Sequence, residues 1–172
     1  HPAAAACGWV RAHLEAFGLR PGVVHVEVER DELLPGGSHR VLLAQYWNGV
    51  PVEAGDGRCS VDPSGRLRFV AAGVLGALAA PVASRLTRAA AIANAASAAG
   101  VPLWRAPADA GLWVRRRGGT DALAWAVRFS LASGLEPRVW VDAVSGTVLE
   151  IETGCANAVG LVYPSDPRGP LE

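Results

Sequence analysis

The chain has 172 residues, 51% of them hydrophobic, so it can bury the core of one ordinary domain or of two small lobes. Its 16 basic and 16 acidic residues balance, which argues against a polyanionic partner or a charged membrane surface. The longest apolar run, residues 70–83, is broken by glycine and falls short of the ~20 residues of a membrane-spanning helix, so we expect a soluble protein.

The cysteines and arginines limit the chemistry further. Cys7, Cys59 and Cys155 form no Cys-x-x-Cys pair, which excludes zinc-ribbon and thioredoxin-like sites and leaves at most one disulfide. The 16 basic residues are all arginine. We attribute this to a GC-rich genome rather than to a need for guanidinium chemistry, and therefore give clusters of arginine little weight.

The start of the chain predicts a helix followed by a strand. Residues 2–6 are small and predict a mobile leader. Apolar residues at helical spacing predict an amphipathic helix over residues 7–17. Valines that alternate with polar residues over residues 24–29 are typical of a half-buried strand.

A hairpin centred on Asn48-Gly49 is the clearest local feature of the sequence. Asn and Gly can hold the two positive-φ positions of a type I′ turn, and aromatic and β-branched residues flank them. We expect the two arms over residues 40–47 and 50–61. The turn Asp62-Pro63-Ser64-Gly65 then leads into a strand over residues 66–72.

The rest of the chain repeats this order of elements. A Gly- and Ala-rich stretch over residues 73–84 is the predicted linker, and Thr87 is the predicted cap of a helix over residues 88–99. The small side chains of that helix would let it lie close against a sheet. After a loop over residues 101–110, alternating or β-branched residues predict strands over residues 112–116, 123–131, 138–142 and 147–152.

Helix and meander occur twice, which predicts an α+β fold of two lobes, each an antiparallel sheet packed on a helix. We place the first lobe at residues 7–80 and the second at residues 81–154. Residues 155–172 form the expected tail or linker toward a further domain.

Two motifs carry a resemblance to a known family. The first runs from Gln45 to Gly55, and its motif residues are Gln45, Trp47, Asn48, Gly49, Pro51, Val52 and Gly55. The second is Val141-Asp142-Ala143-Val144-Ser145-Gly146-Thr147-Val148, in which Val141, Asp142, Ala143 and Gly146 are the motif residues. The first lobe thus resembles the fungalysin/thermolysin propeptide (FTP) domain, and the second resembles a PepSY domain.

This resemblance implies the N-terminal propeptide of a secreted zinc metallopeptidase. Such a propeptide is an intramolecular chaperone and inhibitor of the zymogen, its lobes are cystatin-like, and its partner is the cognate catalytic domain in cis. The fragment itself would then hold no cofactor, and the partner would carry the zinc. We expect the protein to be extracellular or periplasmic, with no nucleic-acid or membrane partner.

The residues do not predict an enzyme. A zinc peptidase needs a His-Glu-x-x-His helix, which this sequence lacks, and its four histidines are scattered as surface or half-buried residues. No serine has the Gly-x-Ser-x-Gly setting of an activated nucleophile. We interpret the run Arg115-Arg116-Arg117 as a solvated strand end rather than a nucleic-acid patch, and the six tryptophans mainly as core.

Cys155 leaves three alternatives open. It follows the last predicted strand, where its thiolate could cap a catalytic zinc of the partner. It could instead form a disulfide with Cys7 or Cys59, or remain a free thiol. Under the propeptide hypothesis, the segment most suited to lie along the partner's cleft consists of Thr153, Gly154, Cys155 and Ala156. The alternative function is a free-standing secreted or periplasmic PepSY-type module that binds or inhibits other proteins.

Overall fold

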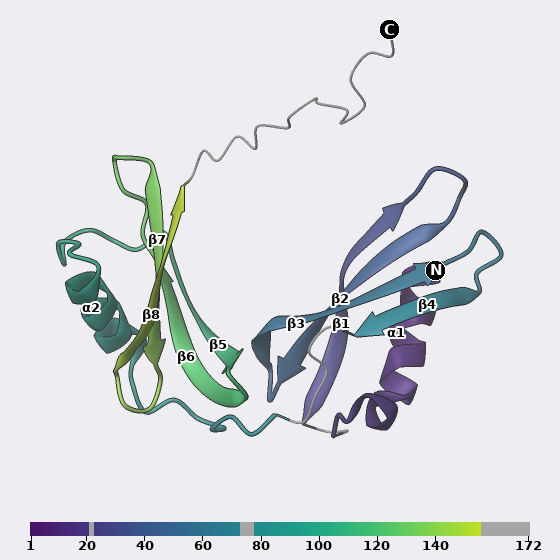
Figure 1. Cartoon of the computed structure of the whole chain (residues 1–172), viewed down its shortest axis with the longest axis horizontal. Helices are drawn as coiled ribbons and strands as arrows, with labels where there is room; N and C mark the ends of the chain where they lie inside the picture. Colours follow the sequence, from purple (N-terminus) through teal and green to yellow (C-terminus); the bar gives the residue numbers. More distant parts are fainter. Residues whose placement is uncertain (21–22, 73–77, 156–172) are drawn as a thin grey trace, which may run out of the picture.

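A computed structural model describes residues 1–20, 23–72 and 78–155 of the chain (Figure 1). Within these residues the secondary structure consists of α1 (Pro2–Ala12), the 3-10 helix η1 (Leu14–Phe17), β1 (Val24–Leu33), β2 (His39–Trp47), β3 (Val50–Val61), β4 (Leu67–Ala72), α2 (Arg88–Ala98), β5 (Asp109–Arg117), β6 (Thr120–Arg128), β7 (Leu135–Asp142) and β8 (Val148–Cys155). The fold is α+β, as predicted, and strands dominate it.

The N-terminal half consists of α1 and strands β1 to β4, which pair antiparallel in the order β1-β2-β3-β4. Helix α1 begins at Pro2, where the missing amide proton of proline costs no helical hydrogen bond. Its buried face consists of Ala3, Ala6, Cys7 and Val10. The prediction of a mobile leader over residues 2–6 is therefore wrong, because Ala3 and Ala6 extend the apolar stripe of the helix onto the sheet.

The predicted turns of this half are confirmed. Asn48 and Gly49 have φ values of 47° and 78°, as a type I′ hairpin requires. The Gly65 amide donates to the carbonyl of Asp62 at 2.9 Å, and Gly65 has a φ of 81°. Local turn chemistry therefore sets the pairing next to each turn, before the register shifts farther along both hairpins.

The C-terminal half consists of α2 and strands β5 to β8, an antiparallel meander. The Thr87 hydroxyl accepts a hydrogen bond from the Ala90 amide at 3.2 Å, which confirms the predicted cap of α2. The helix buries only alanines, Ala91, Ala95 and Ala96. Larger side chains of β6 and β7 and of Phe129, which follows β6, fill the space opposite them, the strand residues being Val127, Val139 and Val141.

The two halves share one connected sheet, with the strand order β1-β2-β3-β5-β6-β7-β8 and β4 paired to β3. Val52 of β3 pairs parallel with Val114 of β5 at their junction. The core of the N-terminal half continues into Val114, Leu123 and Ala143 of the C-terminal half. The prediction of two separate sheets is corrected here, because β3 reaches across to pair with a strand of the other half.

The connection between the halves is packed against the C-terminal half. The Ala79 amide donates to Asp121 at 2.7 Å, and the amides of Arg85 and Leu86 both donate to the carbonyl of Ala143. Residues 73–77 of the predicted linker lie outside the described residues. In the described part of the chain, neither helix is long and apolar enough to cross a bilayer.

Candidate binding cleft

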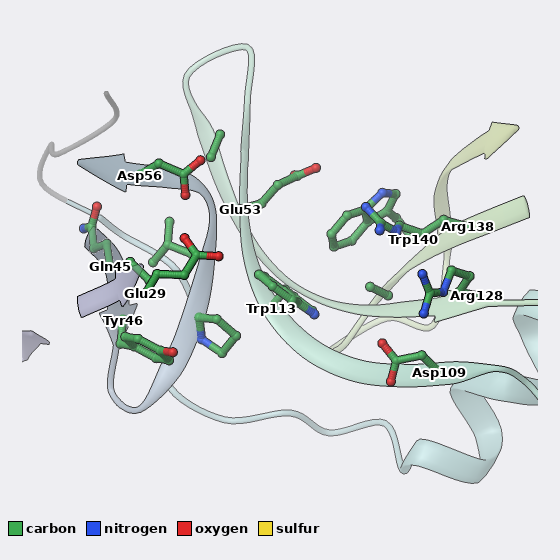
Figure 2. Close-up of a pocket in the computed structure, with 15 residues that line it drawn as sticks. Glu29, Gln45, Tyr46, Glu53, Asp56, Asp109, Trp113, Arg128, Arg138 and Trp140 are labelled. Carbon is green, nitrogen blue, oxygen red and sulfur yellow. The ribbon is translucent and has the colours of Figure 1, made fainter. Parts of the chain in front are cut away.

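A cavity of about 250 Å³ lies where the two halves meet (Figure 2). Helices α1 and α2 lie on the outer sides of the molecule, so the sheet faces that the two halves turn toward each other carry no helix (Figure 1). Its wall in the N-terminal half carries Glu29, Gln45, Tyr46, Glu53 and Asp56. The wall in the C-terminal half carries Asp109, Trp113, Arg128, Arg138 and Trp140. We call this cavity the cleft.

A bulge in β3 builds the cleft. Ala44 pairs with Asp56 and Tyr46 pairs with Pro51, so the single residue Gln45 faces the four residues 52–55 of β3. A bulge bends its strand and redirects the side chains in it. Ala54 adopts a φ of 55°, a left-handed conformation that is uncommon outside glycine. The bulge turns Val52 toward Val114 and so joins the two halves.

Gly55 is required by the close approach of its neighbours. A Cβ atom at Gly55 would lie 2.9 Å from the Cβ atoms of both Gln45 and Val52, closer than side-chain carbons pack. Gln45 is 1% exposed, and its amide atoms have no hydrogen-bond partner among the described residues. Three residues of the first motif therefore fit together at the bulge, while Trp47 is buried in the adjoining core.

Arg115 is the charged centre of the junction. The residue is 5% exposed, and its Nε donates to Glu53 Oε2 at 2.9 Å. Its Nη2 donates to Glu150 and, at 3.2 Å, to Glu152 Oε1. Because Glu53 belongs to β3 and the other two carboxylates to β8, one buried guanidinium ties the two halves together beside the Val52–Val114 pair.

Trp140 supports this ion-pair network. The guanidinium carbon of Arg115 lies 4.5 Å from the centre of the Trp140 ring, a cation–π arrangement. The indole Nε1 of Trp140 donates to Glu152 Oε1 at 2.8 Å. On the sheet face of the C-terminal half that carries no helix, the ion pairs of Arg115 thus lie over the ring of Trp140.

The remaining charges of the cleft are less well paired. Within the described part of the chain, Glu29 and Asp56 form no ion pair. On the opposite wall, Arg128 Nε is buried without a hydrogen-bond partner. Arg138 only approaches Glu152, at 3.8 Å. The N-terminal wall therefore presents carboxylates, while the C-terminal wall presents the two guanidiniums together with the carboxylate of Asp109, with Trp113 and Trp140 beside them (Figure 2).

The second motif forms the turn between β7 and β8, away from the cleft. Asp142 Oδ1 accepts hydrogen bonds from the amides of Val144 and Ser145, at 2.9 and 2.6 Å. Burial acts to raise the pKa of Asp142, but these hydrogen bonds outweigh it and the pKa is lowered. Gly146 has a φ of 77°. The carbonyl of the buried Ala143 accepts hydrogen bonds from the amides of Arg85 and Leu86 in the connection between the halves. This motif positions the connection and the last hairpin.

The segment predicted to contact a partner lies at the end of the sheet. Thr153, Gly154 and Cys155 belong to β8 and align with Pro137, Glu136 and Leu135 of β7. Cys155 is thus the last residue of the strand rather than the first after it, and Ala156 lies outside the described residues. In the described sheet β8 is an edge strand, so its outer side has no strand neighbour.

Cys7 and Cys59 are free, buried thiols, so neither forms the disulfide with Cys155 that the sequence left open. Burial raises the pKa of Cys59 to about 11, and burial also raises the pKa of Cys7 against the opposing charge of Arg11. Both thiols are consequently protonated and unreactive near neutral pH. The zinc-capping role of Cys155 stays a prediction.

The interpretation of the arginine run as a solvated strand end is wrong for Arg115 and Arg116. Arg115 is buried, and Arg116 Nε donates to Asp121 Oδ1 at 2.6 Å. Arg117 is exposed and contacts Glu150. The run of three arginines at the end of a predicted strand was visible in the sequence, but the argument from the overall abundance of arginine gave it little weight.

Across the described residues, no group of three or more His, Cys, Asp or Glu side chains is arranged to hold a metal ion.

Comparisons with known proteins add a distant structural likeness. No model of a known protein family matches the sequence, and no curated protein matches it. Among solved structures, the Bacillus megaterium YpeB C-terminal domain is similar, with a TM-score of 0.45 and 9% sequence identity over 88% of this chain. The chain covers 63% of that structure, less than two thirds of its length. A likeness at this level carries no information on function, and the resemblance to FTP and PepSY domains remains a prediction.

Proposed function

We propose that this chain is the propeptide of a secreted zinc metallopeptidase and binds the catalytic domain through the cleft between its two halves. The observation that carries the proposal is the position of the first motif. Its residues Gln45, Val52 and Gly55 form the bulge that joins the halves and shapes the cleft. In this proposal each half is a cystatin-like lobe, with a sheet curled around one helix.

The cleft and the edge of β8 are suited to a polypeptide partner. A peptide in extended conformation can add to an open strand edge by main-chain hydrogen bonds, and β8 offers such an edge. Leu149 and Ile151 on this strand are large apolar side chains that remain exposed. Contacts of this kind block a substrate-binding cleft, and a stable complex buries about 800 Å² on each partner.

In this proposal the chain breaks no bonds itself. The partner carries the catalytic zinc, and the chain acts as inhibitor and as folding template. Templating follows from the same contacts, because a surface that binds the native catalytic domain also favours its folding if those contacts form early. Assays of zinc content and casein turnover on the isolated chain test this point, and turnover by the chain alone would contradict it.

The central experiment refolds the catalytic domain encoded downstream in the same reading frame, with and without this chain in trans. We expect the catalytic domain to be inhibited as long as the chain is present. Once the chain has been removed, the sample refolded with it should show more peptidase activity than the sample refolded without it. Equal recovery together with no inhibition contradicts the proposal. So does a reading frame that ends without a His-Glu-x-x-His peptidase.

The alternative is a free-standing PepSY-type module that binds other proteins. It is favoured by the fact that cleft and β8 edge are built by described residues alone, so a partner could equally arrive in trans. The reading frame distinguishes the two functions. A peptidase domain supports the propeptide, and a stop codon supports the separate module.

A further inference from the structure

The C-terminal wall of the cleft places two arginines side by side. Arg128 of β6 and Arg138 of β7 are direct cross-strand partners, and both line the cleft. Like charges placed opposite each other destabilise a strand pair. Burial of an unpartnered guanidinium nitrogen, as at Arg128 Nε, adds a further cost. This arrangement would be relieved by an anion that binds to both arginines.

The neighbouring carboxylates do not supply that anion. Glu152 is engaged by the Trp140 indole and by Arg115, and it reaches Arg138 only at 3.8 Å. Glu136 accepts a hydrogen bond from Ser130 at 3.0 Å. Asp109 aligns with Arg128 across β5 and β6, yet the two side chains form no ion pair in the described structure. Asp109 is exposed and so remains a competitor for the site.

We propose that Arg128 and Arg138 form a binding site for the carboxylate of an aspartate or glutamate side chain in an extended polypeptide lying in the cleft. Planar guanidiniums bind carboxylates through paired, charge-assisted hydrogen bonds. Trp113 lies on the same wall, is partly exposed and offers apolar surface to a residue next to the acid, while Trp140 is buried beneath the wall (Figure 2). The proposal deepens the proposed function and rests on it in one respect, that the occupant is a polypeptide.

The opposite wall makes the site selective. Glu29, Glu53 and Asp56 face the cleft from the N-terminal half, and they repel a ligand with many negative charges. A nucleic acid or another polyanion is therefore disfavoured, whereas a segment with one acidic residue at the C-terminal wall is accommodated. A cavity of about 250 Å³ also admits a few side chains rather than a folded element.

The test uses blocked pentapeptides as probes, acetylated and amidated, with glutamate or glutamine at the centre and leucine on both sides. Binding to the full chain is followed by the indole N–H resonances of Trp113 and Trp140. We expect the glutamate peptide to bind about tenfold more tightly than the glutamine peptide. A second glutamine peptide with a free C-terminal carboxylate tests whether a chain end can replace the side chain.

Three variants sharpen the result. Arg128→Gln should abolish the preference for glutamate, while Arg66→Gln, which removes an exposed arginine next to the β3–β4 turn, should keep it. Asp109→Asn should tighten binding of the glutamate peptide, because it removes the competing carboxylate. A merely structural role of Arg128 does not predict this last effect.

Equal binding of the two blocked peptides, or a preference that survives in Arg128→Gln, overturns the site. Tighter binding of the peptide with the free C-terminus than of the glutamate peptide overturns its assignment to a side chain. The peptidase assay distinguishes this proposal from the propeptide function. Equal binding of the two blocked peptides together with inhibition of the peptidase would remove the carboxylate site and leave the propeptide function standing, and peptide preference without inhibition would do the reverse.

Discussion

The two halves share a helix on an antiparallel sheet, but they treat the opposite sheet face differently. In the N-terminal half this face carries Tyr46 stacked on His25 at 4.9 Å, and Glu29 and Asp56 without ion-pair partners in the described structure. In the C-terminal half the corresponding face buries Arg115 and Trp140 in one network. The C-terminal half thus supplies a buried, paired platform beside two poorly paired arginines, Arg128 and Arg138, while the N-terminal half supplies unpaired carboxylates.

The largest effect should come from the centre of that platform. Arg115→Ala removes a buried cation and leaves three carboxylates close together, so we expect the free energy of unfolding to fall by about 3 kcal/mol. Urea denaturation measures it. The control is Arg138→Ala, whose side chain is 46% exposed and whose ion pair is 3.8 Å long, and which should cost less than about 1 kcal/mol. Equal costs would contradict the buried role of Arg115.

A second ion pair fixes the connection to the C-terminal half. Asp121 has a side chain only 4% exposed, and it binds Arg116 and the Ala79 amide. Asp121→Asn should cost about 2 kcal/mol at pH 7. Hydrogen bonding from Arg116 lowers the pKa of Asp121, with burial acting in the opposite direction.

The sign of the pH effect follows from this lowered pKa. The carboxylate stabilises the fold above its unfolded pKa of about 4, and this stabilisation is lost as the pH falls through the lower, folded pKa. Urea midpoints of the wild type and Asp121→Asn should therefore differ at pH 7 and converge in acid. A difference that grows below pH 4 would contradict the assignment.

The bulge that joins the halves gives a smaller effect. Gly55→Ala places a Cβ atom 2.9 Å from two others and should cost about 1–2 kcal/mol. Gly57→Ala is the matched control on the same strand, because its Cβ would meet the Leu43 side chain at 3.4 Å, an ordinary contact. Thermal unfolding of the two variants distinguishes them, and equal midpoints would show that the bulge is not tightly packed.

The smallest effect concerns the cap of α2. Thr87→Ala removes the acceptor for the Ala90 amide and should cost about 1 kcal/mol, whereas Thr87→Ser keeps a hydroxyl that can cap the helix and should leave the stability unchanged. Helix α1 has no side-chain cap at His1, so its stability rests on packing instead. The measurement is the loss of helical circular dichroism with temperature, and identical curves for the two Thr87 variants would refute the cap.

Local features were predictable from the sequence. The Asn48-Gly49 turn, the Thr87 cap and the alternation in β6 each depend on residues within a few positions of one another. The start of α1 was not predictable, because small residues such as Ala3 and Ala6 indicate a buried helix face only when the sheet that covers them is known. Propensity alone did not distinguish a leader from a helix there.

The cleft was not predictable for a different physical reason. The Glu53–Arg115 pair joins residues 62 positions apart, and it forms only because the bulge at Gln45 turns β3 toward β5. Neither residue carries a periodic signal that points to the other. The abundance of arginine also hid Arg115, which stands first in a run of three arginines.

Hydrogen exchange of the chain in complex with the downstream catalytic domain tests the central claim most directly. The account predicts new protection at the amides of β8 and around Trp113 and Trp140, with no change on the outer surfaces of α1 and α2. Protection confined to those outer helical surfaces, while the amides of the cleft exchange as in the free chain, would contradict it.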